Sequence, residues 1–170
     1  MQVAMMTAIL FQSCFIFLTI YAAVSDYQRL KIPNCISLTL CGLFLLYALR
    51  LESWADVGWH IAVGAGVFVA AVVSYAFGVF GGGDVKMIGA VALWAGPERS
   101  VEFAIWTGLL GGALGVLILA ARLLVRSYPD CADRPGAAWN IARWGRDGTC
   151  PYGIPIAMAA LMTVPAMFAT

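Results

Sequence analysis

Charged residues are scarce in this chain of 170 residues. Only 11% are Asp, Glu, Lys or Arg, while 62% are apolar and the mean hydropathy is +0.89. A soluble domain has about 25% charged and about 45–50% apolar residues, so the polar residues here are too few to cover a water-facing globule. Ten basic and nine acidic residues leave a net charge of +1, which excludes a disordered polyelectrolyte and a basic nucleic-acid surface. The composition is that of a polytopic membrane protein.

Charge is completely absent from the first 25 residues. A signal peptide would begin with basic residues and have a shorter apolar core, so we interpret this stretch as a retained first helix. Five more apolar runs follow, and at about 20 residues per span the chain has room for about six membrane helices. The six runs are Val3–Val24, Cys35–Leu49, Ile61–Phe80, Val85–Ala95, Phe103–Val125 and Tyr152–Phe168. The sequence therefore predicts an all-α membrane protein, with residues 1–170 in a single integral domain and no room for a second large one.

Basic residues are divided unevenly between the predicted loops. Eight of them fall on one side of the membrane, whereas the opposite loops hold only Arg50 and Arg99 beside four acidic residues. The eight are Arg29, Lys31, Lys86, Arg122, Arg126, Arg134, Arg143 and Arg146. Cytoplasmic loops carry the excess of Lys and Arg. We therefore expect this side, with the loop 126–150, in the cytoplasm and both termini outside.

The fourth apolar run is unusually short. From Asp84 to Gly96 there are 13 residues, which rise about 20 Å as a helix, roughly 10 Å less than the apolar core of a bilayer. Either the membrane thins here, or the helix begins below the interface in a water-filled recess between its neighbours. The second arrangement would place Asp84 at depth.

Two aspartates lie at the ends of predicted membrane helices, where a charge is costly and indicates function. Asp26 ends the first helix, and Asp84 begins the fourth after three glycines. Each alone could simply lie at the interface, with Asp84 capping a helix N-terminus. The charge count places both on one side, however, so they can meet. Two neighbouring carboxyl groups share one proton, so that one can activate water while the other hydrogen-bonds the attacked carbonyl of an amide.

Residues for other kinds of catalysis are missing or badly placed. His60, the only histidine, is expected at the outer interface, away from the cytoplasmic carboxylates that a Ser–His or Cys–His site would need. The five cysteines contain no C-x-x-C pair, so zinc is not indicated. The segment Gly81–Lys86 lacks the G-x-x-x-x-G-K-[ST] spacing of a phosphate loop. We expect no metal and no cofactor.

Two further features have two interpretations each. Lys86 either extends its ammonium group to the interface or alters the charge of the nearby Asp84. The segment Pro151–Gly153 is either an ordinary helix start with an interfacial tyrosine, or part of the site. The glycines before Asp84 permit a tight turn and the approach of an extended peptide.

Three short motifs together resemble the type IV prepilin peptidases, which are membrane aspartic peptidases of the GxGD type. They are Asp26 followed by Lys31-Ile32-Pro33-Asn34, then Gly81-Gly82-Gly83-Asp84-Val85-Lys86-Met87, then Pro151-Tyr152-Gly153. The small size is similar to that of the short CpaA/TadV-like branch, which serves Flp pili.

The resemblance implies that Asp26 and Asp84 are the catalytic pair. They would cut the short basic leader from prepilins and pseudopilins, on the cytoplasmic face of the bacterial inner membrane. The expected partners are these substrates, the lipid bilayer and the pilus assembly machinery, with no nucleic acid. We expect the substrate to contact Gly81, Gly83, Lys86, Pro151, Tyr152 and Gly153. Larger members carry an extra domain with paired C-x-x-C motifs linked to N-methylation; this chain lacks those motifs, so no methyltransferase domain is expected.

The rival hypothesis is a cation-coupled transporter or a channel subunit, in which Asp26 and Asp84 bind the ion. It would be favoured by inverted repeats and by two matched broken helices. The sequence has no visible repeat and one short helix. A third hypothesis, a structural pilus-assembly subunit without catalysis, leaves the two aspartates unexplained.

Overall fold

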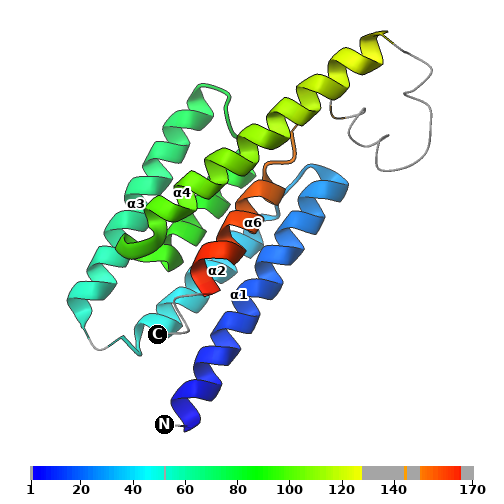
Figure 1. The fold of residues 1–170 in the computed structure, drawn as a ribbon. Coiled ribbons are helices and arrows are strands. Elements are labelled where there is room, and N and C mark those ends of the chain that lie inside the picture. Colours follow the sequence, from blue (N-terminus) through cyan, green and yellow to red (C-terminus); the bar gives the residue numbers. More distant parts are fainter. Residues whose placement is uncertain (1, 52, 128–143, 145–149, 166–170) are drawn as a thin grey trace.

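The computed structural model describes residues 2–51, 53–127, 144 and 150–165. In that part of the chain every regular element is a helix, which confirms the all-α class (Figure 1). The helices are α1 Gln2–Arg29, α2 Asn34–Ala48, α3 Trp54–Ala76, α4 Gly82–Ser127 and α6 Gly153–Thr163. Long apolar runs adopt this form because a helix satisfies its backbone N–H and C=O groups within one segment.

Helix α4 differs most from the prediction. The sequence separates Val85–Ala95 from Phe103–Val125 by a loop, but the structure continues as a helix through this region. The helical dihedral angles are interrupted only at Gly96, with φ 60° and ψ −167°. Pro97 follows directly, at a first helical position where its fixed φ and missing N–H are tolerated. The expected external loop is therefore the first turn of a second helical segment, and Figure 1 shows the chain changing direction at the break.

The break is stabilised by the packing of His60 from α3. Its Nδ1 lies 2.9 Å from the carbonyl oxygen of Leu93, and its ring packs 5.4 Å from that of Phe44. Only glycine fits at position 96, because its φ is positive and an added Cβ would collide with the His60 ring. His60, expected at the outer interface, is thus half-buried against α4.

Three of the described helices are long and apolar enough to cross a membrane. They contain the candidate spans Met6–Arg29, Trp54–Ala76 and Gly82–Leu123. Helices α2 and α6 are shorter apolar helices. The count of six spans and the placement of both termini outside stay predictions.

Trp94, in the first segment of α4, lies at the centre of the core and is fully buried. Its Nε1 donates a hydrogen bond of 2.9 Å to the carbonyl oxygen of Leu40. Its ring lies 5.4 Å from Phe15 of α1, 5.6 Å from Phe44 and 5.4 Å from Tyr47 of α2. Aromatic pairs at these distances stabilise by about 0.5–1.5 kcal/mol each beyond their burial. The cluster fixes the first segment of α4 relative to α1 and α2.

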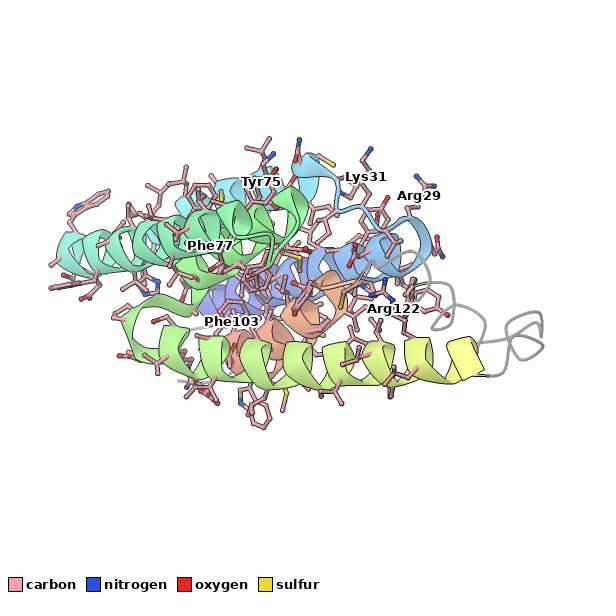
Figure 2. The ribbon with its side chains drawn as sticks, turned by 90° about the horizontal axis from the view of Figure 1, so that it is seen from above. Arg29, Lys31, Tyr75, Phe77, Phe103 and Arg122 are labelled. Carbon is pink, nitrogen blue, oxygen red and sulfur yellow. The ribbon has the colours of Figure 1, made fainter. Side chains whose placement is uncertain are left out.

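One end of the bundle gathers the ends of elements that are far apart in the sequence. The end of α1 and the beginnings of α4 and α6 lie there, with α6 packed against both α1 and α4 (Figure 1). Arg29, Lys31 and Arg122 lie toward this same end (Figure 2). Most of the predicted loop 126–150 lies outside the described residues. The structure describes only four of its positions, which are Arg126, Ser127, Trp144 and Cys150.

Candidate active site

Asp26 lies in the last turns of α1 and is held by the beginning of α6. The side chain is 5% exposed. Its Oδ2 accepts a hydrogen bond of 2.7 Å from the backbone N–H of Gly153, the first residue of α6. A Cβ at position 153 would lie 2.8 Å from both Cβ and Oδ2 of Asp26, a distance that real Cβ atoms do not adopt. A glycine at position 153 therefore lets α1 and α6 approach one another. This approach places the Asp26 carboxylate at the positive end of α6.

Asp84 lies in the first turn of α4 and is 8% exposed. Its Oδ2 accepts a hydrogen bond of 3.0 Å from the backbone N–H of Gly81, just before the helix. This is the half of a capping box in which the third helical residue reaches back to the N-cap. The capping role considered for Asp84 is thus present, and it uses one carboxylate oxygen. Burial beside a second carboxylate is what a simple cap does not require.

The two carboxylates interact electrostatically with one another and with the Cys150 thiol. The charge of Asp26 acts on Asp84, and both act on the Cys150 thiol. Burial, followed by the charges of Asp84 and then Asp26, raises the pKa of that thiol to about 11. Among the described residues, hydrogen bonds reach Oδ2 of each aspartate and leave Oδ1 for a water or a substrate carbonyl.

The segment before α6 forms a wall of the site. Pro151 is fully buried, and the Tyr152 ring packs edge-on against Phe80 at 5.2 Å. The ring also covers Gly111, where a Cβ would lie 2.7 Å from Cε1. Burial raises the pKa of the Tyr152 hydroxyl above its ordinary value, and negative charge on Cys150 and Asp84 raises it further. The hydroxyl is therefore protonated near neutral pH and able to donate a hydrogen bond. The segment Pro151–Gly153 therefore lies beside Asp26, which Gly153 contacts directly.

The glycines before Asp84 have separate contacts. Gly81 donates to the carboxylate, whereas Gly83 faces the loop after α1, where a Cβ would lie 3.2 Å from Ile32 Cβ and 3.3 Å from its carbonyl oxygen. The Ser25 hydroxyl donates to the carbonyl oxygen of Lys31 at 2.8 Å and ties this loop to α1. Gly83 thus permits the loop and the start of α4 to touch.

Lys86 does not join the group. Its Nζ donates a hydrogen bond of 2.9 Å to Asn34 Oδ1, at the beginning of α2. His60 is also remote, because Gly96, which it contacts, lies 12 residues or about 18 Å along α4 from Asp84. In the described part of the chain, no three His, Cys, Asp or Glu side chains gather in a way that could hold a metal ion.

Sequence reasoning missed the contributions of Cys150 and Ile32. Cys150 directly precedes the Pro151–Gly153 motif, and this adjacency was the available signal. Ile32 lies inside the Lys31–Asn34 motif, but nothing in the sequence pairs it with Gly83. Such contacts between distant segments follow from helix packing and not from a local pattern.

One of three comparisons with known proteins found a match. A model of the type IV leader peptidase family matches residues 13–116, more than half of the chain, including both aspartates but not the Pro151–Gly153 motif. Comparisons with curated proteins and with solved structures found no match. The chain belongs to the type IV leader peptidase family.

Proposed function

We propose that this membrane protein is an aspartic endopeptidase with Asp26 and Asp84 as its catalytic pair. The observation that supports this most is their convergence: the two carboxylates come from helices 58 positions apart in the sequence, yet both are buried and interact electrostatically. Each is held through Oδ2 by a glycine N–H beside a helix N-terminus. Burying two acids side by side is unfavourable without a functional reason.

The proposed chemistry is general acid–base hydrolysis of a peptide bond. The pair holds one proton between its two carboxyl groups. The ionised carboxylate takes a proton from water, whose oxygen attacks the carbonyl carbon, while the protonated carboxyl donates to the carbonyl oxygen. The resulting gem-diol then collapses and the C–N bond breaks. The amine leaves with a proton from one carboxyl group, and the other carboxylate takes a proton from a gem-diol hydroxyl, so that the pair again holds one proton and a carboxylic acid product remains. No covalent enzyme intermediate forms.

A substrate must enter as an extended chain, since a helix keeps its carbonyls in internal hydrogen bonds. Gly81 and Gly83 on one side, and Pro151, Tyr152 and Gly153 on the other, border the pair and are the proposed path. The Tyr152 hydroxyl is a candidate donor to the substrate backbone. The chain has no paired C-x-x-C motif, so N-methylation is not part of the proposal.

The substrates proposed are prepilins and pseudopilins of the Flp or type IVb kind, processed during pilus assembly by a member of the short CpaA/TadV-like branch. The motifs Lys31–Asn34 and Gly81–Met87 support this. Arg29, Lys31 and Arg122 lie toward the same end of the bundle (Figure 2). This is the end at which α1 finishes just after Asp26, which supports a cytoplasmic active site in the bacterial inner membrane.

The test is cleavage of a co-expressed prepilin in a strain without another prepilin peptidase. Asp26→Asn and Asp84→Asn keep the side-chain shape but cannot exchange a proton, so each should slow processing by roughly 10³-fold. Asp56→Asn, the same change in the first turn of α3, is the matched control and should process normally. Membrane fractions establish insertion of every variant. Near-normal cleavage by Asp26→Asn or Asp84→Asn would remove the pair from catalysis, whereas no cleavage even by the wild type would favour the transporter hypothesis.

A further inference from the structure

A groove of about 460 Å³ lies between α2 and α3, on the first segment of α4. Each of the three helices contributes four lining residues at the spacing i, i+3, i+4, i+7, which is one face of a helix. Neither catalytic aspartate lines it. The groove is therefore separate from the site described above.

Two glycines allow α3 and α4 to pack closely along one side of the groove. Gly64 of α3 approaches α4 so closely that a Cβ would lie 3.0 Å from Leu93 Cα. Gly89 of α4 likewise faces Phe68, where a Cβ would lie 2.8 Å from Cδ2. Since α3 and α4 are already in contact, the space beside α2 cannot be filled by moving them together.

The groove has one polar end, formed by Lys86 and Asn34. The Lys86 ammonium is bonded to the neutral Asn34 amide oxygen at 2.9 Å. In the described part of the chain no carboxylate lies within ion-pair distance of Lys86. A positive charge without an acidic partner therefore stands at the mouth of an apolar groove.

One helical turn into the groove lies a second polar group without a partner. Ser37 is 6% exposed, lines the groove, and its Oγ has no hydrogen-bond partner among the described residues. Leaving a buried hydroxyl unpaired costs about 1–3 kcal/mol. Because Lys86 is bonded to Asn34, one turn earlier on α2, the unpaired hydroxyl lies about one turn from that end and could donate to a ligand in the groove.

We propose that this groove binds one anionic phospholipid. The phosphate lies at Lys86, the Ser37 hydroxyl donates to an ester carbonyl oxygen, and an acyl chain follows the apolar face past Phe68 toward Leu93. Basic pockets between membrane helices are suited to anionic head groups. A substrate helix fits less well. One turn of a helix about 10–12 Å wide has a volume of roughly 400–600 Å³, so a single turn would by itself fill the groove of about 460 Å³.

Native mass spectrometry of the full chain, released from detergent with phosphatidylglycerol or phosphatidylcholine of identical acyl chains, tests this proposal. The wild type should retain one phosphatidylglycerol in preference to phosphatidylcholine. Lys86→Gln should weaken phosphatidylglycerol binding about fivefold, the equivalent of about 1 kcal/mol per basic residue near the head group. Ser37→Ala should weaken both lipids, because both have ester carbonyls.

Lys31→Gln is the matched control, since Lys31 is an exposed cation near the same end but does not line the groove. It should leave the preference intact. Equal losses in Lys86→Gln and Lys31→Gln, or no loss in either, would overturn the proposal. Ala65→Phe fills the groove from the exposed side of α3 and should release the lipid. Unchanged lipid retention with weakened prepilin binding in that variant would assign the groove to the substrate instead.

Discussion

Each of the two carboxylates accepts a hydrogen bond from a glycine N–H at a helix N-terminus, but the two pairs differ in the sequence separation between the acid and its donor. At α4 the acid and its donor, Asp84 and Gly81, are three residues apart. At α6 the donor Gly153 is 127 residues from Asp26. The first arrangement is a local cap that any helix can form, whereas the second exists only when α1 and α6 are packed. Tertiary structure is therefore what converts a capped aspartate into one member of a pair.

Among the substitutions at these two contacts, Gly153→Ala should reduce prepilin processing most. The added Cβ would meet Cβ of Asp26, which cannot move without shifting α1. A displacement of about 1 Å at a reacting group can cost roughly 100-fold in rate, so we expect at least that loss in prepilin processing. Processing rates in membranes, normalised to the amount of inserted protein, provide the measurement. Normal rates would show that the Asp26–Gly153 contact does not position the acid.

Gly81→Ala should slow prepilin processing less than Gly153→Ala does, by roughly tenfold instead of roughly 100-fold. Its Cβ would lie 3.0 Å from Asp84 Oδ2, the terminal atom of a side chain that can rotate away. The backbone N–H that donates to the carboxylate is retained. The same processing assay measures it. A loss as large as that of Gly153→Ala would mean that the local cap is as rigid as the packed contact.

Alkylation of Cys150 reports on the charges of the pair without an activity assay. The thiolate is the reactive form, and the negative carboxylates disfavour it, which contributes to a thiol pKa of about 11. Below that pH the rate should rise about tenfold per pH unit. Removing a carboxylate lowers the pKa, so Asp84→Asn should speed alkylation at pH 9, and Asp26→Asn should do so to a smaller extent. The exposed Cys35 serves as the control and should react equally in all variants. A profile for Cys150 that neither substitution shifts would place the thiol away from the pair.

Ser25→Ala should have the smallest effect. It removes the hydrogen bond to the carbonyl oxygen of Lys31, which holds the loop over Gly83. A single such bond contributes about 1 kcal/mol, so we expect a lower Tm in detergent with processing largely retained. Loss of processing with an unchanged Tm would show that the loop positions the pair directly.

Much of the site follows from local sequence. The uncharged first helix and the helix starts beside Asp84 and Gly153 are found where the sequence predicts helices, because apolar runs and helix starts are local features. The continuation of α4 through residues 97–102 was predicted as a loop, since charged residues there resemble a connection; Pro97 and the Arg99–Glu102 ion pair of 3.7 Å instead begin a helix.

Other features could not be predicted because they depend on which helix faces meet. The partner of Lys86 is Asn34, 52 positions away, and no charge pattern links them. The groove beside Lys86 arises from the spacing between α2 and α3, and the place of Cys150 arises from how the segment before α6 returns to the bundle. The packing of His60 against Gly96 is of the same kind.

The most direct test of the central claim compares the Asp26→Asn and Asp84→Asn single variants with the double variant. Processing of a prepilin is followed with purified full-length protein in vesicles, at high enzyme concentration so that slow rates remain measurable. Residues that act as one unit lose their whole function when either is removed. We therefore predict that the double variant is within about tenfold of the slower single variant. Losses that multiply, giving a double variant slower by the product of the two single effects, would contradict the account.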